Sequence, residues 1–178
     1  MSLFTATLII AIALIAKGLI WFSLPEQVGS TYTSMLRSPL ASYLLFGLAS
    51  IWVLWNVAHL GEADFGEYRI WLLLLFGAVA IVAFISLKDF LVVRAWAILA
   101  LLIAKVLLDA AYMEPALGRL FLVVFSYIII ILALYFAAVP YKMRDFTNWI
   151  FAKKSRVKQF ASGFIIYGLF LFAALFTY

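Results

Sequence analysis

The pattern of hydrophobic and polar positions divides the chain into long apolar stretches separated by short polar ones. Each apolar stretch has about 18 to 23 residues, which is enough for a helix to cross the hydrocarbon core of a bilayer. The stretches cover residues 3–24, 39–59, 70–87, 90–112, 120–141 and 160–177. The pattern therefore predicts an all-α polytopic membrane protein, a bundle of six transmembrane helices with short loops in a single membrane domain, 1–178.

The polar segments between these stretches predict where the chain turns. Pro25 and Glu26 end the first apolar stretch, and the Ser- and Thr-rich segment 27–38 is expected to be a connector. The segment 61–69 predicts a short acidic hairpin loop, Lys88 and Asp89 a tight turn, and 113–118 a break in the chain. The first stretch is expected to be a retained helix, because no basic residue precedes it and it is long for the core of a signal peptide.

The stretch 90–112 is the one around which the other helices are expected to pack, because it carries Arg94, Lys105 and Asp109 within its apolar run. At about 100° per residue, Lys105 lies about 20° and Asp109 about 60° from Arg94 around the helix. The three charges therefore share one face. A neighbouring stripe is built of small side chains and predicts close packing against another helix; its members are Ala97, Ala100, Ala104 and Ala111.

Charged side chains at membrane depth cost about 2.5–3.5 kcal/mol each at a helix centre, so Lys105 and Lys17 need an explanation. One interpretation is that Lys105 pairs with Asp109 while Arg94 and Lys17 extend toward the membrane boundary. A second is that the four residues line a polar path or an anion site. The spans contain three basic residues at membrane depth but only one acidic residue. A third interpretation is that carboxylates of another subunit or lipid headgroups neutralise the remaining basic residues.

Composition strengthens the membrane interpretation, with 69% hydrophobic and 12% charged residues. The chain has no cysteine, which excludes disulfides and thiolate metal sites. The net charge of +5 is explained by topology, because the first, third and fifth loops with their flanks carry nine Lys and Arg and the other two carry two. These basic loops are expected in the cytoplasm of a bacterium, with both termini outside and the chain in the inner membrane. Nucleic-acid binding is not expected.

The segment 145–159 combines aromatic and aliphatic residues on one helical face with four basic residues, Lys153, Lys154, Arg156 and Lys158. This pattern predicts an amphipathic cytoplasmic helix that binds anionic lipids at the membrane surface. The alternative is a basic loop, spanning 142–158, that only fixes the topology.

His59 with Glu62 and Asp64 is the only cluster that resembles a metal site, and it is a weak one, because metal sites need more convergent ligands. A histidine at a helix end is the simpler interpretation, and no metal or cofactor is expected. No phosphate-binding glycine loop or nucleophile motif is present in the sequence, so enzymatic activity is not favoured.

The segments 61–71 and 109–121 resemble each other, since both are acidic and lead through an arginine into an aromatic-rich helix. Their shared position in the predicted topology explains this better than a duplication. The leading hypothesis for function is an accessory or scaffolding subunit of a larger membrane assembly, in contact with lipid and with other subunits or further copies of itself. The alternative is a small transporter or channel lined by the charges of 90–112 and Lys17.

Overall fold

The computed structural model describes residues 1–86 and 91–178, and these residues contain eight α-helices and no strand. Short 3-10 turns cover Glu62–Asp64, Gly66–Tyr68 and Leu175–Thr177. The helices are α1 (Leu3–Ser23), α2 (Pro25–Arg37), α3 (Pro39–Ala58), α4 (Arg69–Ser86), α5 (Leu91–Ala111), α6 (Arg119–Ala138), α7 (Pro140–Phe151) and α8 (Lys154–Ala174). Six helical segments are long and apolar enough to cross a membrane, which confirms the predicted all-α polytopic fold. The chain is an integral membrane protein.

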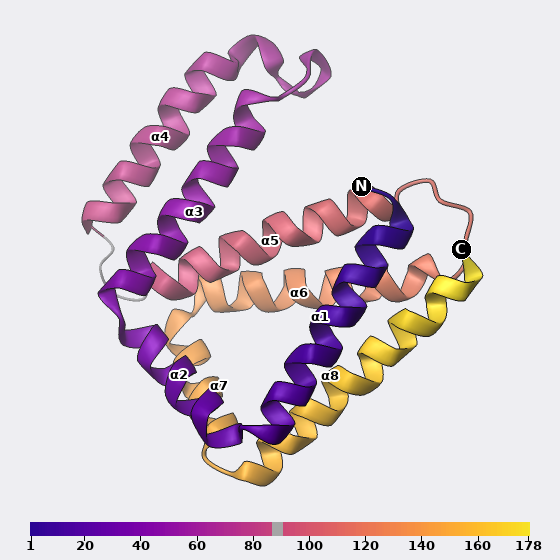
Figure 1. The fold of residues 1–178 in the computed structure, drawn as a ribbon. Coiled ribbons are helices and arrows are strands. Elements are labelled where there is room, and N and C mark those ends of the chain that lie inside the picture. The colour runs from indigo at the N-terminus through magenta and orange to yellow at the C-terminus, as the bar shows by residue number, and fades with distance from the viewer. Residues whose placement is uncertain (87–90) are drawn as a thin grey trace.

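Three pairs of helices form the sides of a triangle (Figure 1). The long pairs are α1 with α8 and α5 with α6, and the third side is the short pair α2 and α7. Both termini lie near the corner where the two long pairs meet. The remaining two helices, α3 and α4, form a hairpin that packs on α5 through α3 and extends away from the triangle.

The triangle is an approximate two-fold repeat of one unit, a long helix followed by a short helix and a second long helix. The first unit is α1, α2 and α5, with the α3–α4 hairpin inserted before α5, and the second unit is α6, α7 and α8. Each contact has its counterpart: α1 with α8 matches α6 with α5, α1 with α2 matches α6 with α7, and α1 with α5 matches α6 with α8. The two units therefore have the same internal contacts, and in both the first long helix begins near the corner where the termini lie (Figure 1).

The bend between the long and the short helix is built in the same way in both units. Leu24 ends α1 with φ −127° and ψ 52°, and Val139 ends α6 with φ −128° and ψ 73°. Each precedes a proline that is the first residue of the short helix, Pro25 or Pro140. Proline has no backbone N–H to donate and disfavours the α conformation in the residue before it, so each long helix ends at this point.

Burial follows the same repeat. When Pro25 is aligned with Pro140, every buried position of α6 falls on a buried position of α1: Leu122, Ser126, Ala133 and Phe136 match Thr7, Ala11, Gly18 and Trp21. When Val93 is aligned with Val157, every buried position of α8 falls on a buried position of α5: Val157, Ala161, Gly168, Leu171 and Ala174 match Val93, Ala97, Ala104, Leu107 and Ala110. The repeat is thus present in the packing as well as in the topology.

Small residues let the two long pairs approach closely. A Cβ atom on Gly18 would lie 2.8 Å from the Ala161 carbonyl oxygen, and one on Gly168 would lie 3.1 Å from the Ala11 carbonyl oxygen. In the other pair, Ala97 and Ala133 lie in one buried cluster, at the positions that match Ala161 and Gly18. Backbone contact through small side chains is a common way for membrane helices to associate.

Segment 27–38 differs from the expected connector, because it forms most of α2. Its hydroxyl groups donate back to carbonyl oxygens within the helix, as Thr31 does to Gln27 at 2.8 Å and Thr33 to Gly29 at 2.9 Å. A Ser- and Thr-rich sequence can therefore stay helical once Pro25 starts the helix. The helix buries Val28 and Gly29.

The basic segment 145–159 also differs from the expected single amphipathic helix, because the chain breaks at Ala152 and Lys153. The short helix α7 ends before the break, and Lys154, Arg156 and Lys158 belong to the first turns of α8. The helix that contains the predicted last span therefore begins at Lys154, six residues before 160. The predicted turn at Lys88 and Asp89 lies outside the described residues.

Candidate functional site

The bend between α1 and α2 encloses an open-sided cavity of about 520 Å³, which is the candidate site. Residues of α1 form one wall and residues of α2 the other. The lining residues are Ala13, Ala16, Lys17, Ile20, Trp21, Leu24, Gln27, Val28, Thr31 and Tyr32. Lys17 is the one polar side chain on the α1 wall, while the α2 wall has three polar side chains, Gln27, Thr31 and Tyr32. Such a surface suits an amphiphilic molecule.

Lys17 is half-buried in this cavity, and its ammonium group contacts aromatic rings. The Nζ atom lies 4.5 Å from the ring centre of Phe164 on α8 and 5.2 Å from that of Trp21. These cation–π contacts offset part of the desolvation of the charge. Lys17 forms no ion pair with any residue that the structure describes. Its side chain extends toward Trp21, one turn nearer to the end of the helix.

An aromatic cluster supports the same corner. The ring of Trp21 lies 5.4 Å from Tyr32, 5.2 Å from Phe151 and 5.4 Å from Phe164, so it joins α1 to α2, α7 and α8. Burial raises the pKa of the Tyr32 phenol above its usual value, and a hydrogen bond with the Trp21 side chain acts in the opposite direction. Tyr32 is therefore neutral over the ordinary pH range.

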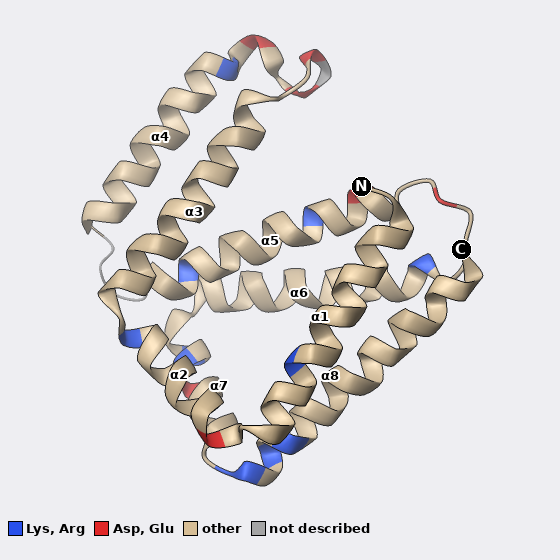
Figure 2. Cartoon of the chain, viewed as in Figure 1, with Lys and Arg blue, Asp and Glu red and all other residues tan. Residues whose placement is uncertain are grey.

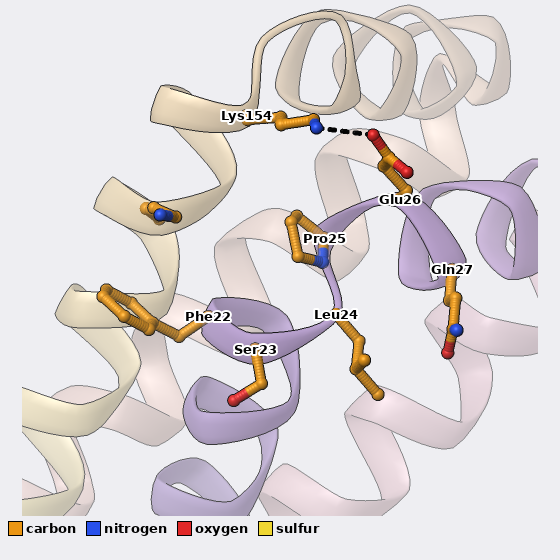
Figure 3. Close-up of a pocket in the computed structure, with 8 residues that line it drawn as sticks. Phe22, Ser23, Leu24, Pro25, Glu26, Gln27 and Lys154 are labelled. Carbon is orange, nitrogen blue, oxygen red and sulfur yellow. Dashed lines mark ion pairs between the residues drawn. The ribbon is translucent and has the colours of Figure 1, made fainter.

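A second cavity of about 350 Å³ lies on the other side of the bend, against the start of α8. The Lys154 ammonium reaches across it to the Glu26 carboxylate at 2.6 Å (Figure 3). The hydrogen bond and the charge of Lys154 lower the pKa of Glu26 below its usual value. Lys158 lines the same cavity and lies over the ring of Phe22 at 5.2 Å.

The four basic residues of 153–158 lie at one end of the molecule. Figure 2 shows Lys and Arg gathered at the break before α8 and along the nearby short helices. Arg156 stacks on Trp149 at 4.4 Å and donates to its backbone oxygen at 2.9 Å, while Lys153 is exposed. Of the four residues, one therefore has an acidic partner, two have an aromatic partner and one is exposed.

Arg94 lies in a different place from Lys17. It lines an apolar cavity of about 230 Å³ between α3, α4 and α5, together with Phe46 of α3 and Phe76 of α4. The structure shows no hydrogen bond or ion pair between Arg94 and any described residue. Arg94 is partly buried beside the hairpin, so it does not share an environment with the other charges.

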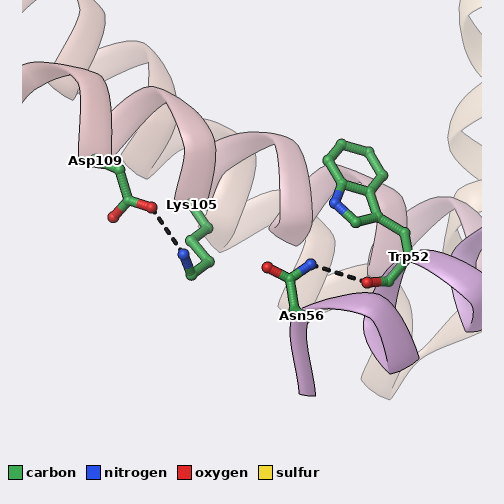
Figure 4. Close-up of polar contacts among 4 residues, drawn as sticks. All are labelled: Trp52, Asn56, Lys105 and Asp109. Carbon is green, nitrogen blue, oxygen red and sulfur yellow. Dashed lines mark hydrogen bonds and ion pairs between the residues drawn. The ribbon is translucent and has the colours of Figure 1, made fainter. Parts of the chain in front are cut away.

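Lys105 and Asp109 form an ion pair, with Nζ and Oδ2 2.7 Å apart. The side chains are 59% and 64% exposed, although both lie within a span. Figure 4 shows the pair on α5 with the Asn56 side chain of α3 across the space between the two helices. Asn56 itself donates to the Trp52 carbonyl oxygen at 2.9 Å. Lys105 therefore has an acidic partner in its own helix, but nothing in the described chain covers the pair.

The alanine stripe of α5 is buried. Ala97 and Ala100 pack with Ala133 of α6, and Ala111 belongs to a cluster that contains Leu3 and Ala6 of α1. Ala104 is fully buried as well. The helix contacts α1, α2, α3, α6 and α7. It is therefore central in the fold, although its charged face is exposed.

The weak metal candidates do not converge. His59 bonds through Nδ1 to the Trp55 carbonyl oxygen at 2.8 Å, and its ring lies 4.3 Å from that of Trp55. In the described parts of the chain no group of three His, Asp or Glu side chains could hold a metal ion, so Glu62 and Asp64 do not join His59 in a site. The histidine is held as a helix-end residue.

Sequence reasoning identified Lys17 but missed the residues around it. Trp21, Tyr32 and Phe164 come from three helices, and no spacing within one helix connects them. The proline after Leu24 was the available signal, because a bend at the end of a long apolar helix creates a concave corner. Comparison of the chain with protein-family models, with curated proteins and with solved structures finds no match.

Proposed function

We propose that this chain is a non-catalytic accessory or scaffolding subunit of a larger membrane assembly. The observation that carries the proposal is the exposed pair of Lys105 and Asp109 within a span. Transfer of charges to hydrocarbon is costly even when they are paired, because the pair loses its water. A polar surface of a partner subunit would remove this cost by covering the pair.

The α3–α4 hairpin offers such a partner a second surface. No residue of α4 is buried, and its contacts run along α3, where Tyr43 and Phe84 lie 4.9 Å apart. The hairpin extends from the triangle, so a partner could contact it and the ion pair of α5 together (Figure 1). Further subunits, or a second copy of this chain, are the proposed occupants.

The proposal includes an orientation in a bacterial inner membrane. The basic end of the molecule, with α2, α7 and the start of α8, would face the cytoplasm according to the positive-inside rule. Both termini would then lie outside. Lys153, Lys154, Arg156 and Lys158 would lie near anionic headgroups of the inner leaflet, where each contributes about 1 kcal/mol to surface binding.

Site-specific photo-crosslinking in native membranes tests the subunit proposal. A photoreactive residue at Asn56, beside the ion pair, is expected to give a discrete protein adduct that mass spectrometry can identify. The same residue at Gly163, on the exposed side of α8 where no atom lies within 4 Å of an added Cβ, is the control position. Replacing Lys105 by Leu together with Asp109 by Ala should abolish the adduct at 56. Lipid adducts alone at both positions would contradict the proposal.

The two-fold repeat favours one alternative, a small transporter, because many transporters consist of parallel repeats related by an axis along the membrane normal. Against it, the four intramembrane charges lie in three separate environments and line no common path. Reconstituted flux of an anionic substrate or protons would support a transporter. Unchanged flux after the combined changes Lys105→Met and Asp109→Asn would exclude these residues as the pathway.

A further inference from the structure

We propose that the cavity at the α1–α2 bend binds one anionic phospholipid, whose phosphate pairs with the ammonium group of Lys17. The site is formed by this chain alone and requires no partner subunit. The proposal can therefore be tested independently of the proposed scaffolding role. It also differs from general attraction of the basic surface for lipid, because it predicts a single, retained molecule.

The distribution of polar atoms in the cavity matches the two ends of a phospholipid. Ala13 and Ala16 line the part of the cavity deeper in the span, where acyl chains would lie. Gln27 and Thr31 line the part nearest to α2. The volume of about 520 Å³ accommodates a headgroup and the first part of its chains, and the open side leaves the rest of the chains in the bilayer.

The charge of Lys17 lies at a suitable level for a headgroup. Its Cα is about 9 Å from that of Ser23 along the helix axis. The side chain then extends toward that end of α1, since its ammonium group lies over the ring of Trp21 one turn further on. A lysine that extends in this way reaches toward the headgroup region from within the span.

Charge complementarity selects an anion as the occupant. In the described chain no carboxylate pairs with Lys17, whereas the neighbouring Lys154 already pairs with Glu26. The Gln27 side-chain amide also has no hydrogen-bond partner among the described residues, so it can donate to a phosphate oxygen. A zwitterionic lipid brings its own cation, which would compete with Lys17, so a headgroup with net negative charge is preferred.

Native mass spectrometry of the full chain tests this site. The chain is reconstituted in nanodiscs of phosphatidylcholine and phosphatidylglycerol in equal amounts and then released. We expect one phosphatidylglycerol to remain bound to the wild type. The change Lys17→Met should weaken its retention about tenfold or more, as expected for the loss of a charge-assisted hydrogen bond, and Lys17→Arg should restore it. Lys142→Met, which removes a base from α7, and Lys158→Met should retain the lipid.

Quenching of tryptophan fluorescence locates the bound lipid. Phosphatidylglycerol with brominated acyl chains should quench Trp21, so the quenched signal should fall in Trp21→Phe and in Lys17→Met but not in Lys142→Met.

Three results would overturn the proposal: equal retention in Lys17→Met and the wild type, loss of the lipid in Lys158→Met instead, or equal retention of phosphatidylcholine. Displacement of the lipid by an equal concentration of oleate would assign the site to a fatty-acid carboxylate and would also overturn it.

Discussion

The two units of the repeat share their packing, but three charged positions of the first unit are apolar in the second. Lys17 of α1 falls on Leu132 of α6, while Lys105 and Asp109 of α5 fall on Leu169 and Ala173 of α8. The second unit has the same packing with apolar residues at these three positions. We therefore expect that the fold does not require Lys17, Lys105 and Asp109, and this expectation connects them with binding.

The inserted hairpin is the second difference between the units. In the first unit α3 and α4 come between α2 and α5, whereas in the second only Ala152 and Lys153 separate α7 from α8. The matching basic residues show the consequence. Arg94 is partly buried beside residues of α3 and α4, and Lys158, which falls on the same position, is exposed beside Phe22. The hairpin therefore shields the basic residue of the first unit more than the second unit shields its counterpart.

The largest effect is expected at the close contact of α1 and α8. A Cβ atom on Gly168 would lie 2.7 Å from Ile15 Cγ1 and 3.1 Å from the Ala11 carbonyl oxygen, so Gly168→Leu should lower the free energy of unfolding by about 3 kcal/mol or more. Ala104→Leu at the matching position of α5 should cost a similar amount. Both values can be measured by denaturant unfolding of the chain in detergent.

The control lies in the same helix. An added Cβ on Gly163 meets no atom within 4 Å, so Gly163→Ala should leave stability unchanged or raise it by up to about 1 kcal/mol. If Gly168→Leu destabilises the chain and Ala104→Leu does not, the two long pairs pack differently and the repeat does not extend to their energetics.

The next effect tests whether the charges of α5 are independent of the fold. Asp109→Ala leaves Lys105 without its ion-pair partner within a span, and should cost about 1–3 kcal/mol. Adding Lys105→Leu gives α5 the same residues that α8 has at these positions, and should restore wild-type stability or exceed it. Thermal unfolding of the two variants in nanodiscs measures the difference. A double variant less stable than Asp109→Ala would show that the pair supports the fold.

The membrane spans and the Lys105–Asp109 pair could be predicted because both depend on local sequence. Length and hydropathy define a span, and a spacing of four residues brings two side chains together on any helix. The repeat could not be found in this way. Its matching positions are mostly small or apolar, such as Ala97 with Ala161 and Ala104 with Gly168, and residues of this kind occur throughout the chain. The suggested likeness of 61–71 and 109–121 does not correspond to the units of this repeat.

The candidate site could not be predicted from the sequence, because its residues come from helices that are distant in the chain. Whether α1 meets α8 or another span is decided by tertiary packing, and the ends of the chain are far apart in sequence. The small residues of α1 and α8 only become informative once Gly18 is known to face Ala161. The environment of Lys17 follows from that pairing, since Phe164 comes from α8. The sequence could therefore indicate that Lys17 needs a partner, but not which surface surrounds it.

The prolines test whether the two bends are equivalent. Pro25→Ala and Pro140→Ala should each cost about 0.4–1 kcal/mol, because alanine gives the unfolded chain more freedom and no longer opposes continuation of the long helix. Equal losses in thermal unfolding would support equivalent bends. In addition, a larger loss for Pro25→Ala in the presence of phosphatidylglycerol than in its absence would show that the cavity at this bend contributes binding energy.

The smallest effect concerns a contact that only the first unit has. Glu26 falls on Tyr141, so the ion pair with Lys154 has no acidic counterpart at the second bend. The pKa of Glu26 lies below its usual value of 4.5 in the folded chain. The pair therefore stabilises the fold above the unfolded-state pKa, and this contribution is lost as the pH falls through the lower folded-state pKa.

We expect Glu26→Gln to lower the melting temperature slightly at pH 7, and the difference from wild type to disappear in the acid range below 4.5. Glu67→Gln, in the loop before α4, should show no such pH dependence. A difference for Glu26→Gln that persisted in acid would mean that the side chain contributes through its packing at the bend, in which case the asymmetry between the two bends would be steric and not electrostatic.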